Sequence, residues 1–81
     1  MEASQILKEV NAIFIEVLDN PDIVLTSESS AKTIDEWDSL NHILLVVAIE
    51  KHFKIKFTTA EIQGWANAGE LCNTIFNKIQ A

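Results

Sequence analysis

The sequence predicts an all-α protein, a small four-helix bundle with three longer helices, one short helix and a long first loop. Two observations carry this prediction. Apolar residues recur at spacings of three and four along most of the chain, which is the period of a helix packed on one side. The chain has 81 residues, which leaves room for one domain with a small core. We therefore expect residues 1–81 to form a single domain.

The first helix is predicted over residues 4–19. Asn20 and Pro21 end it, because proline disfavours the helical conformation of the residue before it and has no amide hydrogen to donate. Its apolar stripe consists of Ile6, Val10, Ile13 and Val17, widened by Leu7, Phe14 and Leu18.

A long connection is predicted over residues 22–36, which hold three serines and two threonines and show no continuous helical or strand period. We expect Ile23, Leu25 and Ile34 to pin this loop to the core. A loop of this length in a compact domain is usually functional or disordered. We interpret it as functional.

The second helix is predicted to begin at Ser39, with the Asp38 carboxylate as its N-terminal cap. Residues 43–49 are all apolar, a run that also fits a buried strand, but the uninterrupted length favours a helix. A helix that is apolar nearly all round is expected to be buried on several sides. On this view Leu40 and Ile43 face the core and leave the Ser39 hydroxyl pointing outward.

Two further helices are predicted after a connector over residues 54–57. Thr58 and Glu61 fit a capping box that opens a short helix through Ile62, which Gly64 closes. The last helix starts near Ala68. Its apolar stripe consists of Leu71, Cys72, Ile75, Phe76 and Ile79.

Charge and composition exclude several classes of function. Six basic against twelve acidic residues give a net charge of −6, which repels nucleic acid and anionic membranes and favours basic partner proteins. The apolar run over residues 43–49 is far shorter than the roughly 20 residues of a transmembrane helix. A single cysteine, Cys72, and no signal-peptide pattern indicate a soluble protein of the reducing cytoplasm.

The segment Glu36-Trp37-Asp38-Ser39-Leu40 resembles the Asp-Ser-Leu attachment motif of acyl carrier proteins. The order and spacing of the predicted helices extend this resemblance over nearly the whole chain. It implies that a phosphopantetheinyl transferase, using coenzyme A and Mg²⁺, attaches a 4′-phosphopantetheine arm covalently to Ser39. The arm then carries acyl groups as thioesters, and Asp38 and Leu40 flank the attachment. A helix N-terminus also suits a phosphodiester, because its free amides and dipole favour an anion.

Catalysis by the chain itself is not expected. His42 shares a side of the helix with Ser39, but a Ser/His pair without an orienting third group or an oxyanion hole is poor evidence for a hydrolase. We expect His42 to face solvent or a partner, and we find no metal-ligand spacing. An aminoacyl or D-alanyl carrier, or a small interaction domain that never carries the arm, are the alternatives.

The second helix departs from the family pattern, which places acidic residues on the exposed face to meet basic partners. The positions where acids are usual hold Asn41, His42, Leu44, Lys51 and His52. We expect a carrier for acyl-transferring or acyl-processing enzymes of fatty-acid, polyketide or specialised acyl biosynthesis, and the missing acids favour a dedicated pathway over housekeeping fatty-acid synthesis. We also expect a monomer. Leu44 is expected to be exposed, with Leu40, Ile43 and Val47 turned inward. Candidate partner contacts are Glu36, His42, Leu44, Glu50 and Glu61. Candidate lining for an acyl chain is Leu45, Val46, Ile49, Phe57, Ile62 and Trp65.

Overall fold

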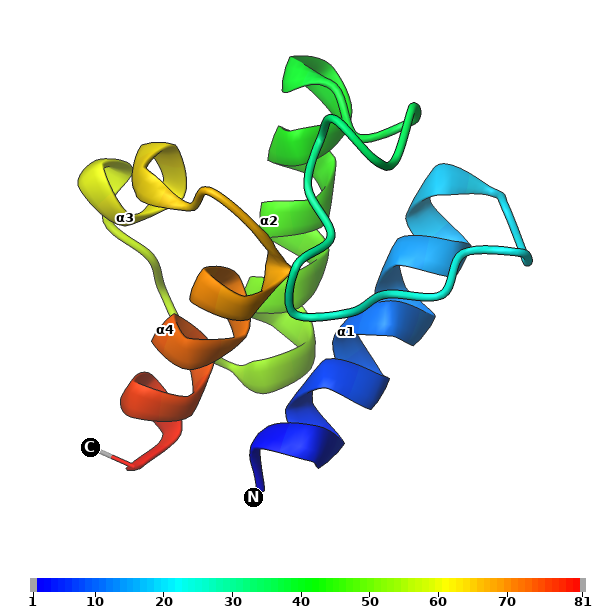
Figure 1. Cartoon of the computed structure of the whole chain (residues 1–81). Helices are drawn as coiled ribbons and strands as arrows, with labels where there is room; N and C mark the ends of the chain where they lie inside the picture. The colour runs from blue at the N-terminus through cyan, green and yellow to red at the C-terminus, as the bar shows by residue number, and fades with distance from the viewer. Residues whose placement is uncertain (1, 81) are drawn as a thin grey trace.

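The computed structural model describes residues 2–80, and the described chain is all-helical (Figure 1). Its elements are α1 (Ala3–Leu18), α2 (Ser39–Phe53), α3 (Thr59–Gly64) and α4 (Ala68–Gln80). Helix α1 packs against both α2 and α4, while the short α3 lies beside the first half of α2 (Figure 1). The predicted all-α architecture, with three longer helices and one short one, is confirmed.

The ends of α1 and α2 follow the predicted boundaries to within one residue. The Asp38 carboxylate accepts a hydrogen bond from the Asn41 amide at 2.8 Å, which satisfies one of the free amides in the first turn of α2. Each of these two helices is followed directly by a non-glycine residue in the left-handed conformation, Asp19 with φ 53° and Lys54 with φ 57°. This conformation costs roughly 1–2 kcal/mol for a residue with a side chain.

The capping box of α3 is present as predicted. The Thr58 hydroxyl accepts from the Glu61 amide at 3.2 Å, and the Glu61 carboxylate accepts from the Thr58 amide at 2.8 Å. The expected role of Gly64 was wrong in detail. Gly64 is the last helical residue and has no positive φ, and the chain leaves the helix through Trp65 in an extended conformation. The turn therefore does not need a glycine there.

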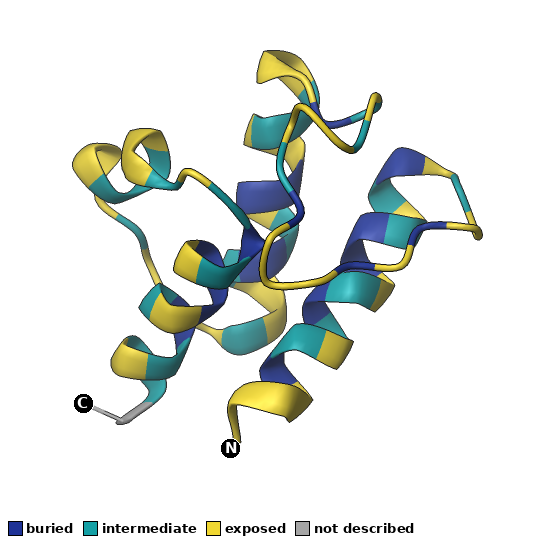
Figure 2. Cartoon of the chain, in the orientation of Figure 1, coloured by how far each residue is buried: buried dark blue, intermediate teal, exposed yellow. Residues whose placement is uncertain are grey.

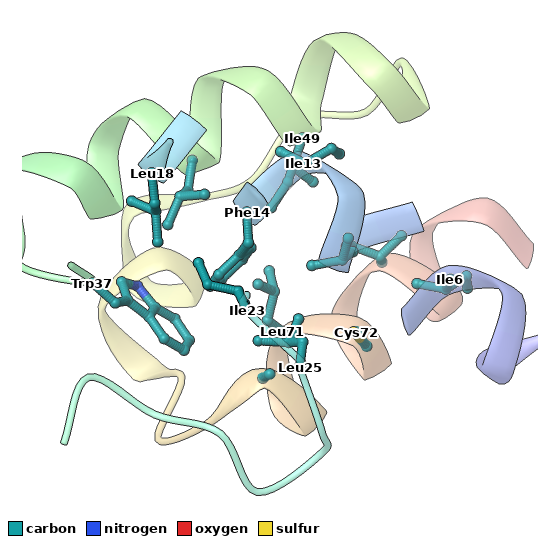
Figure 3. Packing of buried hydrophobic residues seen from close by; sticks show 14 residues of the cluster. Ile6, Ile13, Phe14, Leu18, Ile23, Leu25, Trp37, Ile49, Leu71 and Cys72 are labelled. Atoms are coloured by element: carbon teal, nitrogen blue, oxygen red, sulfur yellow. The ribbon is translucent and has the colours of Figure 1, made fainter. Parts of the chain in front are cut away.

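The core is assembled from one face each of α1, α2 and α4, together with three loop side chains (Figures 2 and 3). Ile23 and Leu25 are buried and Ile34 is half-buried, so the prediction that they pin the loop is confirmed. The buried cluster consists of Ile6, Val10, Ile13, Phe14, Leu18, Ile23, Leu25, Trp37, Leu45, Ile49, Ala68, Leu71, Cys72 and Ile75.

Backbone and side-chain hydrogen bonds order the long loop between α1 and α2. The Asn11 side chain accepts from the Leu25 amide. Farther along, the amides of Ala68 and Gly69 at the start of α4 donate to the carbonyls of Ser29 and Ser27 at 2.7 and 2.8 Å. Because the loop is attached to α1 and to α4, it delivers Trp37 and Asp38 to a fixed position at the start of α2.

The expectation that α2 is buried on several sides was wrong. Its inward side chains are Leu45, Val46 and Ile49. The remaining apolar side chains are largely exposed: Leu40 by 70%, Ile43 by 59%, Leu44 by 49% and Val47 by 44%. A chain of this size cannot supply enough structure to enclose a central helix, and the outer side of α2 is left uncovered. The predicted exposure of Leu44 is confirmed, but the inward stripe of Leu40, Ile43 and Val47 is not.

Candidate functional site

Ser39 is the first residue of α2 and is exposed to solvent. Asp38 before it has an extended backbone, with φ −100° and ψ −178°, so the chain turns sharply from loop to helix at this point. The exposed first turn of α2 forms one end of the molecule, away from both termini (Figure 2). The hydroxyl therefore stands where a modifying enzyme has access, at a helix N-terminus that favours an anion. Leu40 is also exposed, so the outward position of Ser39 does not depend on a buried Leu40.

The approach to Ser39 is held by the buried side chain of Trp37, which is 6% exposed. The indole meets the Phe14 ring edge-on, with centroids 4.9 Å apart (Figure 3). The Asn41 side chain donates to the Glu36 carbonyl at 2.8 Å, from the first turn of α2 back to the loop. Through these contacts the Trp37 indole packs the loop onto the bundle.

His42 connects three elements instead of facing solvent. Its Nδ1 accepts the indole N–H of Trp37 at 2.9 Å, and its Nε2 lies 2.9 Å from the Ile62 carbonyl of α3. With Nδ1 acting as an acceptor, the proton is assigned to Nε2, which donates to that carbonyl. Both nitrogens are then occupied, and His42 has no free nitrogen to serve as a base for Ser39. The ring is half-buried against these elements, so the expectation that it faces solvent was wrong, while its contact with a partner stays a prediction.

The three acidic candidates for partner contact all bond within the protein. Glu36 accepts from the Asn20 side chain at 2.8 Å, and Glu50 accepts from the Phe57 amide at 2.9 Å. Glu61 completes the capping box and pairs with Lys78 at 3.0 Å. The Thr58 amide, followed by Lys78, lowers the pKa of Glu61. These carboxylates position the loop, the connector before α3 and α3 itself; the role of Glu61 was predicted from the capping box, whereas the roles of Glu36 and Glu50 were not.

A groove of about 600 Å³ opens beside Ser39 between the loop, α2 and α3. Of the residues expected to line a shelter for an acyl chain, Ile62 and Trp65 line this groove. Phe57 does not line it, but its ring contacts the Trp65 ring edge-on. The expectation was wrong for Leu45, Val46 and Ile49, which belong to the buried face of α2. The groove is lined by Ala31, Trp37, Asp38, Ser39, His42, Ile43, Thr59, Ile62, Gln63, Trp65 and Ala66.

Neither the cysteine nor the potential metal-ligating side chains of residues 2–80 form a second reactive or metal-binding site. Burial raises the pKa of the Cys72 thiol to about 11, so the thiol is protonated and unreactive at neutral pH. Within the described part of the chain, no three His, Cys, Asp or Glu side chains gather in a way that would hold a metal ion. None of the described helices combines the length and the apolar character needed to cross a membrane.

The fold and the exposed serine are those of a carrier protein, and comparison with known proteins identifies the family. No protein-family model matches the chain, and no curated protein does. Among solved structures, the chain is similar to the solution structure of a holo acyl carrier protein from Geobacter metallireducens, with a TM-score of 0.86. The two are 44% identical over 91% of this chain and 85% of the other. The chain therefore belongs to the acyl carrier protein family, whose members are carriers and not enzymes.

Proposed function

We propose that Ser39 carries a 4′-phosphopantetheine arm and that the protein presents acyl thioesters on it to partner enzymes. The observation that carries this proposal is the position of Ser39, an exposed hydroxyl in the first turn of α2 at the end of a braced loop. The holo state of the similar Geobacter protein supports a covalent arm. The arm supplies the thiol that forms the thioester, and the chain supplies the exposed attachment point.

The residues on either side of Ser39 have separate roles in this proposal. The Asp38 carboxylate caps α2 and so fixes the direction in which Ser39 points, and it also lies beside the hydroxyl that a phosphopantetheinyl transferase must reach. Leu40 offers an exposed apolar contact next to the attachment point. Tethering then raises the effective concentration of the cargo at each enzyme that the carrier docks to. In this proposal residues 1–81 act as one carrier domain, monomeric and cytoplasmic, serving a dedicated pathway.

The groove beside Ser39 offers a place for the first part of the cargo. Its walls include the aromatic rings of Trp37 and Trp65 and the apolar side chains of Ile43 and Ile62. These surfaces favour an acyl chain over the charged ammonium of an aminoacyl group. The aminoacyl or D-alanyl carrier therefore ranks second, and an interaction domain without an arm ranks third.

Co-expression with a broad-specificity phosphopantetheinyl transferase tests the attachment. Intact mass should rise by about 340 Da, the mass of the arm, and Ser39→Ala should abolish the increase while keeping the helical circular dichroism spectrum. Ser30→Ala is the matched control from the loop and should be modified fully. An unmodified parent chain would support the interaction domain, and a modified Ser39→Ala would place the arm elsewhere.

The cargo is best identified on protein isolated from its source. The mass of the group released by thioester cleavage distinguishes an acyl chain from an amino acid. A released amino acid would overturn the preference for acyl cargo without affecting the assignment of Ser39.

A further inference from the structure

The exposed side of α2 carries a continuous apolar stripe that begins next to Ser39. We define the apolar stripe as Leu40, Ile43, Leu44 and Val47. Its spacings of three and four place these side chains on one face of the helix, and all are at least 44% exposed. Helices of monomeric proteins usually turn such a face to the core, and a contiguous exposed apolar patch indicates an interaction site.

The same face ends in a cluster of positive charge. The lysine cluster comprises Lys51, Lys54 and Lys56, half of the six basic residues in the chain. Lys51 follows Val47 by four residues and so continues the line of the apolar stripe. The three lysines are exposed and surround a hollow of about 370 Å³, which Val47 and Ile55 also line.

The lysine cluster outnumbers the one carboxylate that lines the same hollow. The ion pairs found in residues 2–80 join His52 to Glu9 and Lys78 to Glu61, and include no member of the cluster. Glu50 also lines the hollow, and its carboxylate accepts from the Phe57 amide at 2.9 Å, but its single charge offsets only one of the three lysines. A protein of net charge −6 thus presents a positive surface at one end of its exposed apolar face.

We propose that this face docks a partner protein whose apolar groove ends in carboxylates that meet the lysine cluster. The proposal rests on the proposed role of Ser39 only for the position of the arm. Lys51 lies twelve residues after Ser39, about 18 Å along the helix, so the partner's carboxylates lie about that far from where the arm enters. The net charge of the chain would suggest a basic partner surface, whereas the lysine cluster fits an acidic one.

The distances explain why the local charge prevails over the net charge. The acidic residues nearest the apolar stripe at its other end are Asp35, Glu36 and Asp38, before Ser39. At physiological ionic strength the Debye length is about 8 Å, so charges about 18 Å away are largely screened at the lysine cluster. Lowering the salt to about 0.01 M extends the Debye length to about 30 Å and should strengthen the attraction of carboxylates to the lysine cluster, because surface electrostatic interactions are then screened less.

A second copy of the chain is a less suitable occupant of this face. Pairing two apolar stripes would cover Leu40, which directly follows Ser39, and would obstruct the attachment point of the arm. A partner enzyme, in contrast, must approach Ser39 to reach the cargo. The apolar stripe and the attachment point therefore fit one docking event.

A spin-labelled peptide shows in which direction a charged helix binds along the exposed face of α2. The probe is a synthetic amphipathic helix with a leucine stripe, glutamates at one end and lysines at the other, added to the ¹⁵N-labelled full chain at about 0.15 M salt. A nitroxide at the acidic end should broaden the amides of Lys51, Lys54 and Lys56 more than those of Ser39 and Asn41. The two orientations should differ about tenfold in population, the ratio that two or three exposed ion pairs provide.

Charge-reversal variants decide the outcome. Lys51→Glu combined with Lys54→Glu should remove or invert the orientation, whereas Lys8→Glu combined with Lys32→Glu changes the net charge equally and should leave it intact. Equal broadening at both ends, no binding, or concentration-dependent dimerisation of the chain in sedimentation would each overturn the proposal. The same titration on Ser39→Ala should give the same result, so a failure of modification at Ser39 is distinguishable from a failure here.

Discussion

The indole N–H of Trp37 donates to Nδ1 of His42 across 2.9 Å, and the two rings lie at 26° to each other. Trp37 belongs to the loop before Ser39, and His42 lies one turn after Ser39 on α2. Through its other nitrogen His42 also reaches the Ile62 carbonyl of α3. One imidazole therefore joins the three elements that surround the attachment serine.

Replacement of this imidazole should destabilise the fold. In His42→Ala the Trp37 N–H loses its acceptor in a buried environment, which costs about 1–3 kcal/mol. His52→Ala is the matched control, because His52 is exposed and its bond to Glu9 at 2.7 Å is a surface contact worth at most about 1 kcal/mol. Urea unfolding measures both variants. Equal losses would show that the bridge contributes no more than a surface pair.

The sequence predicted the elements of the fold because their signals are local. The stripe of α1, the Asp38 cap and the Thr58–Glu61 capping box depend on residues close together in the chain. Burial of α2 was predicted wrongly because periodicity reports only that a face is apolar. Whether Leu40 and Val47 are covered depends on how much of the chain remains to cover them, which is a property of the whole fold.

The candidate site was predictable at the motif but not in its surroundings. Asp38 and Ser39 were found because a cap and a first-turn residue are adjacent in sequence. The hydrogen bond from His42 to Ile62 joins residues twenty positions apart, and no local sequence pattern predicts it. The structural roles of Glu36 and Glu50 were missed for the same reason, since a count of charges does not reveal which carboxylates accept bonds from the loop and the connector.

The exposed apolar stripe should contribute little to stability. Leu44→Ala and Val47→Ala should each change the free energy of unfolding by no more than about 0.5 kcal/mol, as at other surface positions. Leu45→Ala, on the buried face of the same helix and 2% exposed, should cost about 2–5 kcal/mol through the cavity it leaves. Denaturant melts of the three variants test this. A loss at Leu44 comparable to that at Leu45 would remove the argument that Leu44 is available for docking.

The two glycines should respond to alanine in opposite directions. A Cβ on Gly69 would lie 2.8 Å from the Ser27 carbonyl oxygen, which is backbone that the loop holds in place, so Gly69→Ala should cost about 1–3 kcal/mol. A Cβ on Gly64 meets nothing within 4 Å, and Gly64→Ala should stabilise by about 0.4–1 kcal/mol through the unfolded chain. Thermal unfolding of both variants measures the difference. A neutral Gly69→Ala would mean that the loop moves freely away from α4.

Acid should destabilise the protein partly through Glu61. Its carboxylate accepts from the Thr58 amide and pairs with Lys78, which holds the pKa of Glu61 below its ordinary value of 4.5. Because the pKa of Glu61 is lower in the folded protein, the unfolded chain binds the proton more tightly. Stability therefore falls as the pH drops from about 4.5 toward the lower pKa of the folded state. Glu9 has a lowered pKa for similar reasons, with bonds from Gln5 and His52, and acts in the same direction.

The contribution of Glu61 can be isolated by removing its titration. Glu61→Gln keeps an oxygen that can accept from the Thr58 amide but carries no charge, so its unfolding free energy should depend less steeply on pH than that of the parent below about pH 4.5. Adding Glu9→Gln should flatten the dependence further, while Glu28→Gln, at an exposed loop position, serves as the control. The measurement is a series of urea unfolding curves from about pH 6 to about pH 3. An unchanged slope in Glu61→Gln would show that the capping carboxylate and its pair with Lys78 do not stabilise the folded state.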